Sequence, residues 1–212
     1  MYIKKITHNY PSFCLDVSDI EIESNKIIGL IGENGAGKTT FMNLLANIEQ
    51  SNGEFRVIDY EKIDILYIPS NLEPYEYLTV NEFVEVIRKY SKTNKSNVQI
   101  LEFLELQNKK NTLISGLSQG MKKKLSLINI FIHDYQLIIL DEPFNSVDVK
   151  YIYQLKKMMV GLKSKSTILI SSHILDTLND ICDEFIYLKD GKVYKKFENA
   201  GNIDSLEREL FD

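Results

Sequence analysis

A glycine-rich segment, GENGAGKTT at residues 32–40, limits the possible folds of this chain more than any other feature. It matches the pattern G-x-x-x-x-G-K-[ST] and lies between a continuous apolar run, KIIGLI, and FMNLLANI, which has helical spacing. Glycines in such a strand–loop–helix unit let backbone N–H groups turn inward around phosphate oxygens without Cβ clashes. The segment therefore predicts a phosphate-binding loop. A glycine-rich turn with a chance Lys-Thr pair would not require the strand before it and the helix after it.

Two side chains of this loop have the chemistry that bound phosphates need. Lys38 supplies a positive charge for the β- and γ-phosphates, and the Thr39 hydroxyl is a ligand that Mg²⁺ accepts. The predicted nucleotide-binding residues are Asn34, Gly35, Ala36, Gly37, Lys38, Thr39 and Thr40.

An acidic pair follows a second apolar run, in LIILDEP at residues 137–143. Ligands of open α/β sheets bind at the C-terminal edge of the strands, where this run places Asp141 and Glu142. Asp141 suits Mg²⁺, directly or through water, and Glu142 suits the general base that activates a water molecule. The alternative is an exposed acidic turn after a core strand. The presence of a phosphate loop in the same sequence favours the metal and base roles over this alternative.

His173 follows a third apolar run, TILIS at residues 167–171, within the segment ISSHILD. An isolated histidine is more often a structural residue than a catalytic one. This one lies at the same predicted sheet edge as the phosphate loop and the acidic pair, so we expect it to contact a γ-phosphate.

The order of the apolar patterns predicts an α/β fold with a mainly parallel sheet. Residues 1–31 alternate as strands do, and GEFRVIDY, KIDILYIP and residues 184–197 supply further strands, the last with a Lys-Asp-Gly-Lys hairpin signal. Residues 79–106 instead carry apolar residues three and four apart, and Thr79 with Glu82 forms a predicted capping box. We therefore expect a helical insert between the strand-rich parts.

Charge and cysteine content argue against some classes of protein. The formal net charge is -5, so the sequence has no basic field that favours nucleic acid. Cys14 and Cys182 stand alone, which argues against a disulfide framework or a zinc site and favours a reducing cytoplasm. The first residues lack an apolar signal core, and the longest apolar runs are shorter than the roughly 18–20 residues that a membrane-spanning helix needs.

The segment ISGLSQGMKKKLSL at residues 114–127 has the features of half an anion site. Small residues precede a basic run with helical spacing, and the free N–H groups at a helix start attract anions. The segment nevertheless has no phosphate-loop lysine and no metal-binding carboxylate. For Lys122, Lys123 and Lys124 we expect a solvated helix face rather than direct phosphate contacts.

GENGAGKTT, LSQGM, LIILDEP and SSH occur in the order of the ATP-binding cassette (ABC) ATPases, which this chain resembles over nearly its full length. The resemblance implies a P-loop NTPase of the ABC type, with a mainly parallel core sheet, an N-terminal antiparallel β subdomain and an inserted α-helical subdomain. The single domain, residues 1–212, would consist of a core at about 1–73 and 126–212 and a helical signature subdomain at about 74–125.

The resemblance also implies that two such domains sandwich two ATP molecules with Mg²⁺, each ATP between one phosphate loop and the partner's signature motif. LSQGM resembles the family's LSGGQ signature, so Ser118 and Gly120 would contact the γ-phosphate of the partner's ATP. Asp148 matches the D-loop aspartate, and Tyr10, or otherwise Phe13, matches the aromatic residue that stacks on adenine. The signature residues are Leu117, Ser118, Gln119, Gly120 and Met121, of which Gln119 and Met121 depart from LSGGQ.

YIPSNLEPYEYLTV at residues 67–80 resembles the family's Q-loop, where a Gln usually follows the Pro. Ser70 takes that position here, with a shorter reach but still one oxygen, and some relatives in the exporter branch also lack the Gln. The resemblance leads us to expect that Ser70 contacts the metal ion through water.

The family implies the ATP-hydrolysing subunit of an ABC transporter, on the cytoplasmic inner face of the cell membrane. The expected partners are integral membrane transporter subunits and a second ABC ATPase subunit, identical or different, with no nucleic acid. The chain length leaves no room for the C-terminal regulatory domain that many importer ATPases carry, which favours export.

The alternative is a soluble ABC ATPase that acts on ribosomes or DNA, against which the single cassette and the acidic charge argue. A GTPase would want a guanine-specifying N-K-x-D segment, and the sequence has none. A catalytically inactive regulatory subunit would not need Lys38, Asp141, Glu142 and His173 together.

Overall fold

The computed structural model describes residues 1–71, 75–91, 93–173 and 175–201. Within these residues nine strands form one sheet in the order β4-β1-β2-β9-β8-β3-β7-β6-β5. The strands are β1 (Tyr2–Tyr10), β2 (Phe13–Glu21), β3 (Ile27–Ile31), β4 (Phe55–Ile58), β5 (Ile65–Ile68), β6 (Leu137–Leu140), β7 (Thr167–Ser171), β8 (Glu184–Lys189) and β9 (Lys192–Glu198).

The middle of the sheet is parallel, as the sequence predicts. β3 pairs in parallel with β7 and β8, and β6 pairs in parallel with β5 and β7. The three apolar runs that the sequence assigns to buried strands form β3, β6 and β7, and every residue of these strands is buried. Continuous apolar runs are expected where both faces of a parallel sheet are covered.

Alternate residues of β3 show how the two faces are covered. Ile27 and Ile31 belong to one apolar cluster, which includes residues of α2–α6, and Ile28 and Leu30 belong to a second cluster. The second cluster joins the buried side of α1 to β1 and β2. Because successive strand residues point to opposite faces, the phosphate loop that follows Ile31 leaves the sheet between two packed layers.

One side of the sheet is mainly antiparallel, with a single parallel pairing between β2 and β9. β1 pairs with β2 and β4, and β8 pairs with β9, all in antiparallel register. The Lys-Asp-Gly-Lys hairpin is confirmed: Asp190 and Gly191 join β8 to β9 with φ values of 48° and 75°, which a tight hairpin turn requires at both central positions.

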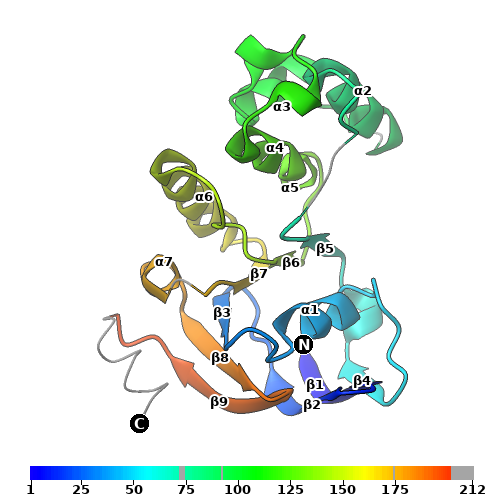
Figure 1. The fold of residues 1–212 in the computed structure, drawn as a ribbon, viewed down its shortest axis with the longest axis vertical. Helices are drawn as coiled ribbons and strands as arrows, with labels where there is room; N and C mark the ends of the chain where they lie inside the picture. Colours follow the sequence, from blue (N-terminus) through cyan, green and yellow to red (C-terminus); the bar gives the residue numbers. More distant parts are fainter. Residues whose placement is uncertain (72–74, 92, 174, 202–212) are drawn as a thin grey trace.

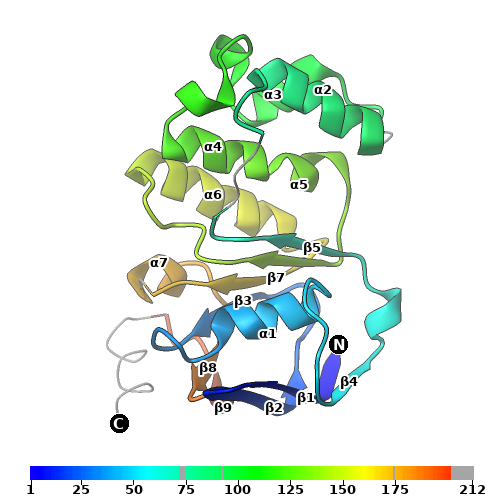
Figure 2. The same ribbon diagram turned by 45° about the vertical axis from the view of Figure 1, so that its right-hand side comes forward.

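The helices include a group at one end of the molecule and others against the sheet. Figure 1 shows α2–α5 gathered away from the sheet, and Figure 2 shows α6 between this group and the strands. The helices are α1 (Lys38–Leu45), α2 (Val80–Ser91), α3 (Asn97–Phe103), α4 (Gln119–Ser126), α5 (Ile128–Ile132), α6 (Val149–Leu162) and α7 (Leu175–Asn179), with 3₁₀ turns at Tyr60–Lys62, Gln107–Lys109 and Ile114–Gly116.

The predicted capping box at the start of α2 is confirmed. The backbone N–H and the hydroxyl of Thr79 both donate to Glu82 Oε2, at 2.8 and 2.7 Å, and the Glu82 N–H donates to Thr79 Oγ1 at 3.2 Å. The helix within FMNLLANI begins earlier than its apolar pattern, because the last residues of the phosphate loop already form the first turn of α1.

Among the residues that the structure describes, no helix combines the length and the apolar character needed to cross a bilayer.

Two glycines, one in the turn between β8 and β9 and one in α6, allow the geometry of that turn to be tested. Gly191 has a φ of 75°, and a Cβ atom there would lie 2.0 Å from the Cys14 carbonyl oxygen, whereas a Cβ on Gly161 in α6 would meet no heavy atom within 4 Å. We expect Gly191→Ala to lower the free energy of unfolding by about 1–3 kcal/mol. We expect Gly161→Ala to raise it by about 0.5–1 kcal/mol, because alanine is the better helix residue. Urea denaturation measures both, and equal effects would contradict the assigned geometry.

Candidate functional site

The glycine-rich loop lies between β3 and α1, at the C-terminal edge of the parallel strands. Gly37 precedes the first turn of α1 with a φ of 101°, a conformation that residues with a Cβ rarely adopt. Lys38 is buried, and its Nζ donates to the carbonyl oxygens of Gly32 at 2.7 Å and Glu33 at 3.1 Å. The ammonium group is thus held inside the loop by neutral acceptors, and a phosphate oxygen would be a stronger acceptor for it.

A cavity of about 580 Å³ opens over this loop. Its lining residues are Ser12, Phe13, Asn34, Gly35, Gly37, Lys38, Thr39, Thr40, Asp141 and Glu142. The structure therefore places most of the predicted loop residues at one cavity, together with the acidic pair from β6. Ala36 is buried beneath it, and its carbonyl accepts from the Gly191 N–H at 3.1 Å.

The two candidate aromatic residues differ in their positions. Phe13 lines the cavity and packs against the loop, because a Cβ on Gly37 would lie 2.6 Å from its ring. Tyr10 is 39% exposed, is not among the lining residues, and has its ring centroid 6.3 Å from that of Phe13. Its hydroxyl donates to Glu49 Oε1 at 2.7 Å, and this hydrogen bond raises the pKa of Tyr10.

Asp141 joins three elements at the end of β6. Its carboxylate accepts a hydrogen bond from Thr39 Oγ1 at 2.9 Å and another from Ser171 Oγ at 2.7 Å. Asp141 is 3% exposed, and a buried carboxylate is costly unless donors or cations surround it. The phosphate-loop hydroxyl and the acidic residue that the sequence assigned separately to Mg²⁺ are therefore direct neighbours.

Glu142 and His173 also meet at this edge. The Nδ1 atom of His173 lies 3.0 Å from Glu142 Oε2, and the Glu142 N–H donates to Ser171 Oγ at 2.9 Å. Glu142 has a φ of 47°, which is uncommon for a residue with a side chain and points to a conformation that its surroundings maintain. His173 lines a neighbouring cavity of about 280 Å³ with Gly32, Glu33 and Asn34.

The arrangement fits a Mg²⁺-bound nucleotide. The oxygens of Thr39 and Asp141 are adjacent, and Mg²⁺ usually takes one or two protein oxygens and completes its coordination with phosphate and water. Among the described residues, no group of three or more His, Cys, Asp or Glu side chains could enclose a metal ion. The adjacent oxygens of Thr39 and Asp141 therefore suit an ion that arrives with phosphates.

The predicted signature residues lie away from this cavity. Ser118 caps α4, its Oγ accepting from the Met121 N–H at 3.3 Å, and it is exposed together with Gln119. Leu117 is buried, Gly120 is half-buried, and Met121 packs against the apolar cluster of the helices. Within one chain, the structure does not bring Ser118 to the phosphate loop.

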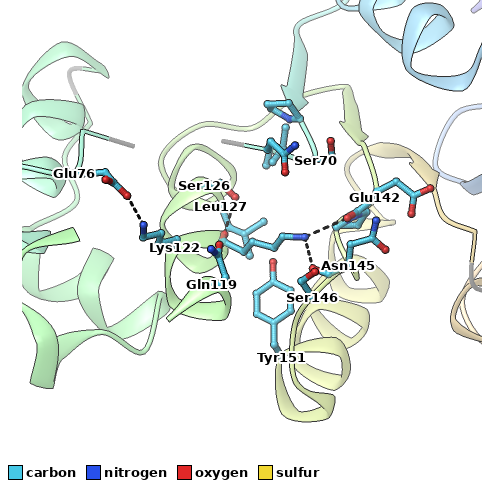
Figure 3. Close-up of a pocket in the computed structure, with 15 residues that line it drawn as sticks. Ser70, Glu76, Gln119, Lys122, Ser126, Leu127, Glu142, Asn145, Ser146 and Tyr151 are labelled. Carbon is cyan, nitrogen blue, oxygen red and sulfur yellow. Dashed lines mark hydrogen bonds and ion pairs between the residues drawn. The ribbon is translucent and has the colours of Figure 1, made fainter. Parts of the chain in front are cut away.

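A second cavity, of about 560 Å³, separates α4 from the strand edge and is shown in Figure 3. Ser70 and Gln119 line it together with Glu142, and Asn145 and Ser146 line it from the loop after β6. Ser70 therefore shares a cavity with Glu142, but not with Thr39 and Asp141. Residues 72–74 of the predicted Q-loop segment lie outside the described residues.

Asp148 caps the helix that follows. Its Oδ1 accepts from the Tyr151 N–H at 2.8 Å at the start of α6, and its Oδ2 lies 3.7 Å from the position that a Cβ on Gly120 would take. The predicted D-loop aspartate thus lies against the first turn of α4 in the same chain.

The expectation of a solvated lysine face on α4 is wrong. Lys122 pairs with Glu76 and Lys124 with Glu105, and each lysine side chain is 18% exposed. Lys123 Nζ donates to the backbone carbonyls of Asn145 at 2.6 Å and Glu142 at 3.3 Å. The consecutive lysines point in different directions around the helix, and their partners come from segments that a sequence-local argument does not relate to α4.

Sequence reasoning missed Ser171 and Lys123. Ser171 ends TILIS two residues before His173, so its position at a strand end was the available signal, but its bond to Asp141 depends on strand order. Lys123 was assigned to solvent because no local pattern indicates a buried partner.

Three comparisons with known proteins agree with the geometry. The family model for ABC transporters matches residues 15–145. The uncharacterized ABC transporter ATP-binding protein YxlF of Bacillus subtilis (strain 168) is 32% identical over 186 residues, which are 84% of this chain and 63% of YxlF. The chain therefore spans less than two thirds of that relative's length.

Two further matches cover more of the compared chains. The tungstate uptake system ATP-binding protein TupC of Peptoclostridium acidaminophilum is 32% identical over 197 residues, which are 86% of this chain and 90% of TupC. A solved structure of an ATP-binding subunit of an ABC transporter has a TM-score of 0.80 and 26% sequence identity, with 100% of this chain and 99% of the other covered.

The Asp141 network predicts an effect on stability. Ser171→Ala removes one donor from a buried carboxylate and the acceptor of the Glu142 N–H, so it should lower the free energy of unfolding by about 1–3 kcal/mol. Ser164→Ala, at an exposed serine in the segment between α6 and β7, should change it by less than about 0.5 kcal/mol. Urea denaturation compares the two, and an equally small effect of both would show that Ser171 is not a required donor.

Proposed function

The chain belongs to the ABC transporter family of ATP-binding proteins, and from this premise we propose that it is the ATP-hydrolysing subunit of a transporter whose membrane subunits are separate proteins. Members of this family bind and hydrolyse ATP. The finer assignments, of residues, partners and direction, are our proposals.

One observation carries the proposal for hydrolysis. Lys38, Thr39, Asp141 and Glu142 line one cavity at the C-terminal edge of the parallel strands, and His173 Nδ1 lies 3.0 Å from Glu142. A phosphate loop, a pair of Mg²⁺-type oxygens and a carboxylate supported by a histidine are the parts that phosphoryl transfer to water requires.

The residues take the following proposed roles. The loop N–H groups and Lys38 bind the phosphates, and Thr39 and Asp141 hold the Mg²⁺, which supplies charge neutralisation when bound. Glu142 accepts the proton of the attacking water, and His173 orients the Glu142 carboxylate and faces the γ-phosphate. Tyr10 or Phe13 stacks on the adenine, and the position of Phe13 in the cavity lining supports Phe13.

A second ATPase subunit completes the proposed site. Ser118 is an exposed helix N-cap and lies outside its own chain's cavity, so its free face and the N–H groups of α4 are available to the ATP of a partner. We propose that Leu117, Ser118, Gln119, Gly120 and Met121 contact that ATP and that Asp148 lies near the interface, in a homodimer or a heterodimer.

The proposed membrane partners place the protein on the cytoplasmic face of the cell membrane. We propose export as the direction of transport. Ser70 would reach the metal ion through water only after a movement toward Thr39 and Asp141, because it lines the cavity around α4 with Glu142 and does not line theirs. The name of TupC states uptake for that protein. Transport by the purified complex in vesicles of known orientation distinguishes export from uptake, and co-purification from membranes identifies the membrane subunits.

Glu142→Gln tests the proposed general base. The amide keeps the shape of the side chain but accepts no proton, so ATP binding should persist while the hydrolysis rate falls by about 10²–10⁴-fold. The blocked protein should also accumulate as a dimer with ATP. Phosphate release and size-exclusion chromatography with ATP measure these effects. Glu102→Gln, at an exposed residue of α3, serves as the control, and normal hydrolysis by Glu142→Gln would remove Glu142 from the role of base.

Ser118→Arg tests the contact across the dimer. A bulky side chain at this exposed cap should abolish ATP-dependent dimerisation and cooperative hydrolysis, while the affinity of the monomer for ATP changes less than about threefold. Ser164→Arg, at an exposed position away from α4, should change neither property. Equilibrium binding of a fluorescent ATP analogue and the rate against protein concentration measure both. A large loss of monomer affinity would place Ser118 in its own chain's ATP site.

A further inference from the structure

Lys123 projects from α4 toward the loop that follows β6. Its Nζ donates to the carbonyl oxygen of Asn145 at 2.6 Å and to that of Glu142 at 3.3 Å. Figure 3 labels both of these acceptor residues. Burial lowers the pKa of Lys123, and the negative charge of Glu142 opposes this change. The side chain thus gives up part of its hydration to contact two neutral carbonyl groups.

The loop that Lys123 contacts has an unusual backbone. Glu142 and Ser146 have φ values of 47° and 58°, in the left-handed region that residues with a Cβ rarely occupy. Such conformations persist where the surroundings determine them. This loop therefore needs contacts from outside itself.

The backbone of Glu142 receives these contacts on both sides. Its N–H donates to Ser171 Oγ at 2.9 Å, and its carbonyl oxygen accepts from the Asn145 N–H and from Lys123 Nζ, each at 3.3 Å. Lys123 also fixes the far end of the same turn through the Asn145 carbonyl. The orientation of the peptide groups around Glu142 consequently depends on side chains of β7 and α4.

The direction of the Glu142 carboxylate follows from its backbone. The carboxylate points away from Gln119 and Lys122 in Figure 3, and its Oε2 lies 3.0 Å from His173 Nδ1. Because a base must lie within hydrogen-bond reach of the water that it activates, a rotation of this turn would misplace it.

We propose that Lys123 is a positioning residue, which binds the carbonyls of Glu142 and Asn145 and thereby aims the Glu142 carboxylate and joins this loop to α4, the helix that Ser118 caps. The inference rests on the proposed role of Glu142 as the base. It adds a residue of the signature helix that acts on the hydrolysis site of its own chain.

The neighbouring lysines provide matched comparisons. Lys122 and Lys124 lie on the same helix, but they pair with the exposed carboxylates of Glu76 and Glu105. Exposed ion pairs usually contribute little to stability. Lys124→Met thus removes the same charge from α4 as Lys123→Met without touching the loop after β6.

Lys123→Met should lower kcat for ATP hydrolysis by about 10–100-fold, because a small displacement of a catalytic group has an effect of this size. The KM for ATP and the affinity for a fluorescent ATP analogue should change less than about threefold, since the phosphate loop is intact. Lys124→Met should keep kcat within about twofold of the original value. A general loss of folding would instead change affinity and rate together.

A double-mutant cycle separates positioning from a structural role. If Lys123 acts through Glu142, adding Lys123→Met to Glu142→Gln should leave the residual single-turnover rate unchanged within about twofold. Multiplication of the two separate losses would contradict the proposal. So would normal hydrolysis by Lys123→Met while Glu142→Gln is inactive. Normal hydrolysis by Glu142→Gln alone would instead reject the proposed base and leave the Lys123 carbonyl contacts as structural ones.

The thermal midpoint of each variant shows whether it is folded at the assay temperature. If Lys123→Met is unfolded there, Lys123→Gln, which is neutral but still polar, is assayed below its own midpoint. The expected result is the same fall in kcat with unchanged ATP affinity, and a kcat within about twofold of that of Lys124→Met would overturn the proposal.

Discussion

The buried carboxylate of Asp141 is the interaction on which the arrangement of this site depends. It accepts hydrogen bonds from Thr39 at the start of α1 and from Ser171 at the end of β7, so one side chain relates the phosphate loop to two neighbouring strands. Two hydroxyl donors compensate only part of the cost of a buried negative charge. A divalent cation beside Thr39 would compensate more of it, which is the physical reason why the same residues suit both the fold and Mg²⁺.

Glu142 stands between two cavities with different walls. The cavity over the phosphate loop is lined by Lys38, Thr39 and Asp141, and the second is lined by Ser70, Gln119 and other residues around α4. Because Glu142 lines both cavities, it borders the phosphate loop as well as the residues around α4. A movement of the helices α2–α5 relative to the sheet would change the second cavity first and would reach the proposed hydrolysis site through the turn at Glu142.

The sequence predicts the parallel core because buried strands are continuous apolar runs, and β3, β6 and β7 each lie where such a run occurs. The capping box of α2 and the hairpin at Gly191 were predictable for a different reason: each depends on residues close together in the chain. The phosphate loop, the acidic pair and His173 could be placed at one sheet edge by strand direction alone. Their residue roles remain proposals that the mutations above test.

The remaining features depend on contacts between distant segments. Helix α6 was not predicted, and the bond from Ser171 to Asp141 exists because β6 and β7 are neighbours in the sheet, which periodicity does not reveal. The left-handed φ of Glu142 has no local signal, since no glycine marks it. The error for Lys122, Lys123 and Lys124 has the same origin. A run of charged residues predicts a solvent-exposed face, but here distant segments of the fold supply partners for these side chains.

The two ends of α4 give the half anion site in the sequence a physical meaning. Ser118 at the start of α4 is exposed, whereas Lys123, about one and a half turns later, contacts the loop of Glu142 inside the same chain. Both residues belong to the same short helix, so a displacement of α4 at Ser118 would also move Lys123 if the helix stays intact. In the proposed dimer, ATP bound by the partner would therefore contact Ser118 and alter the position of Glu142, the proposed base for hydrolysis of the chain's own ATP. An incomplete anion site on the surface and a lysine directed inward are then two parts of one connection between the ATP sites.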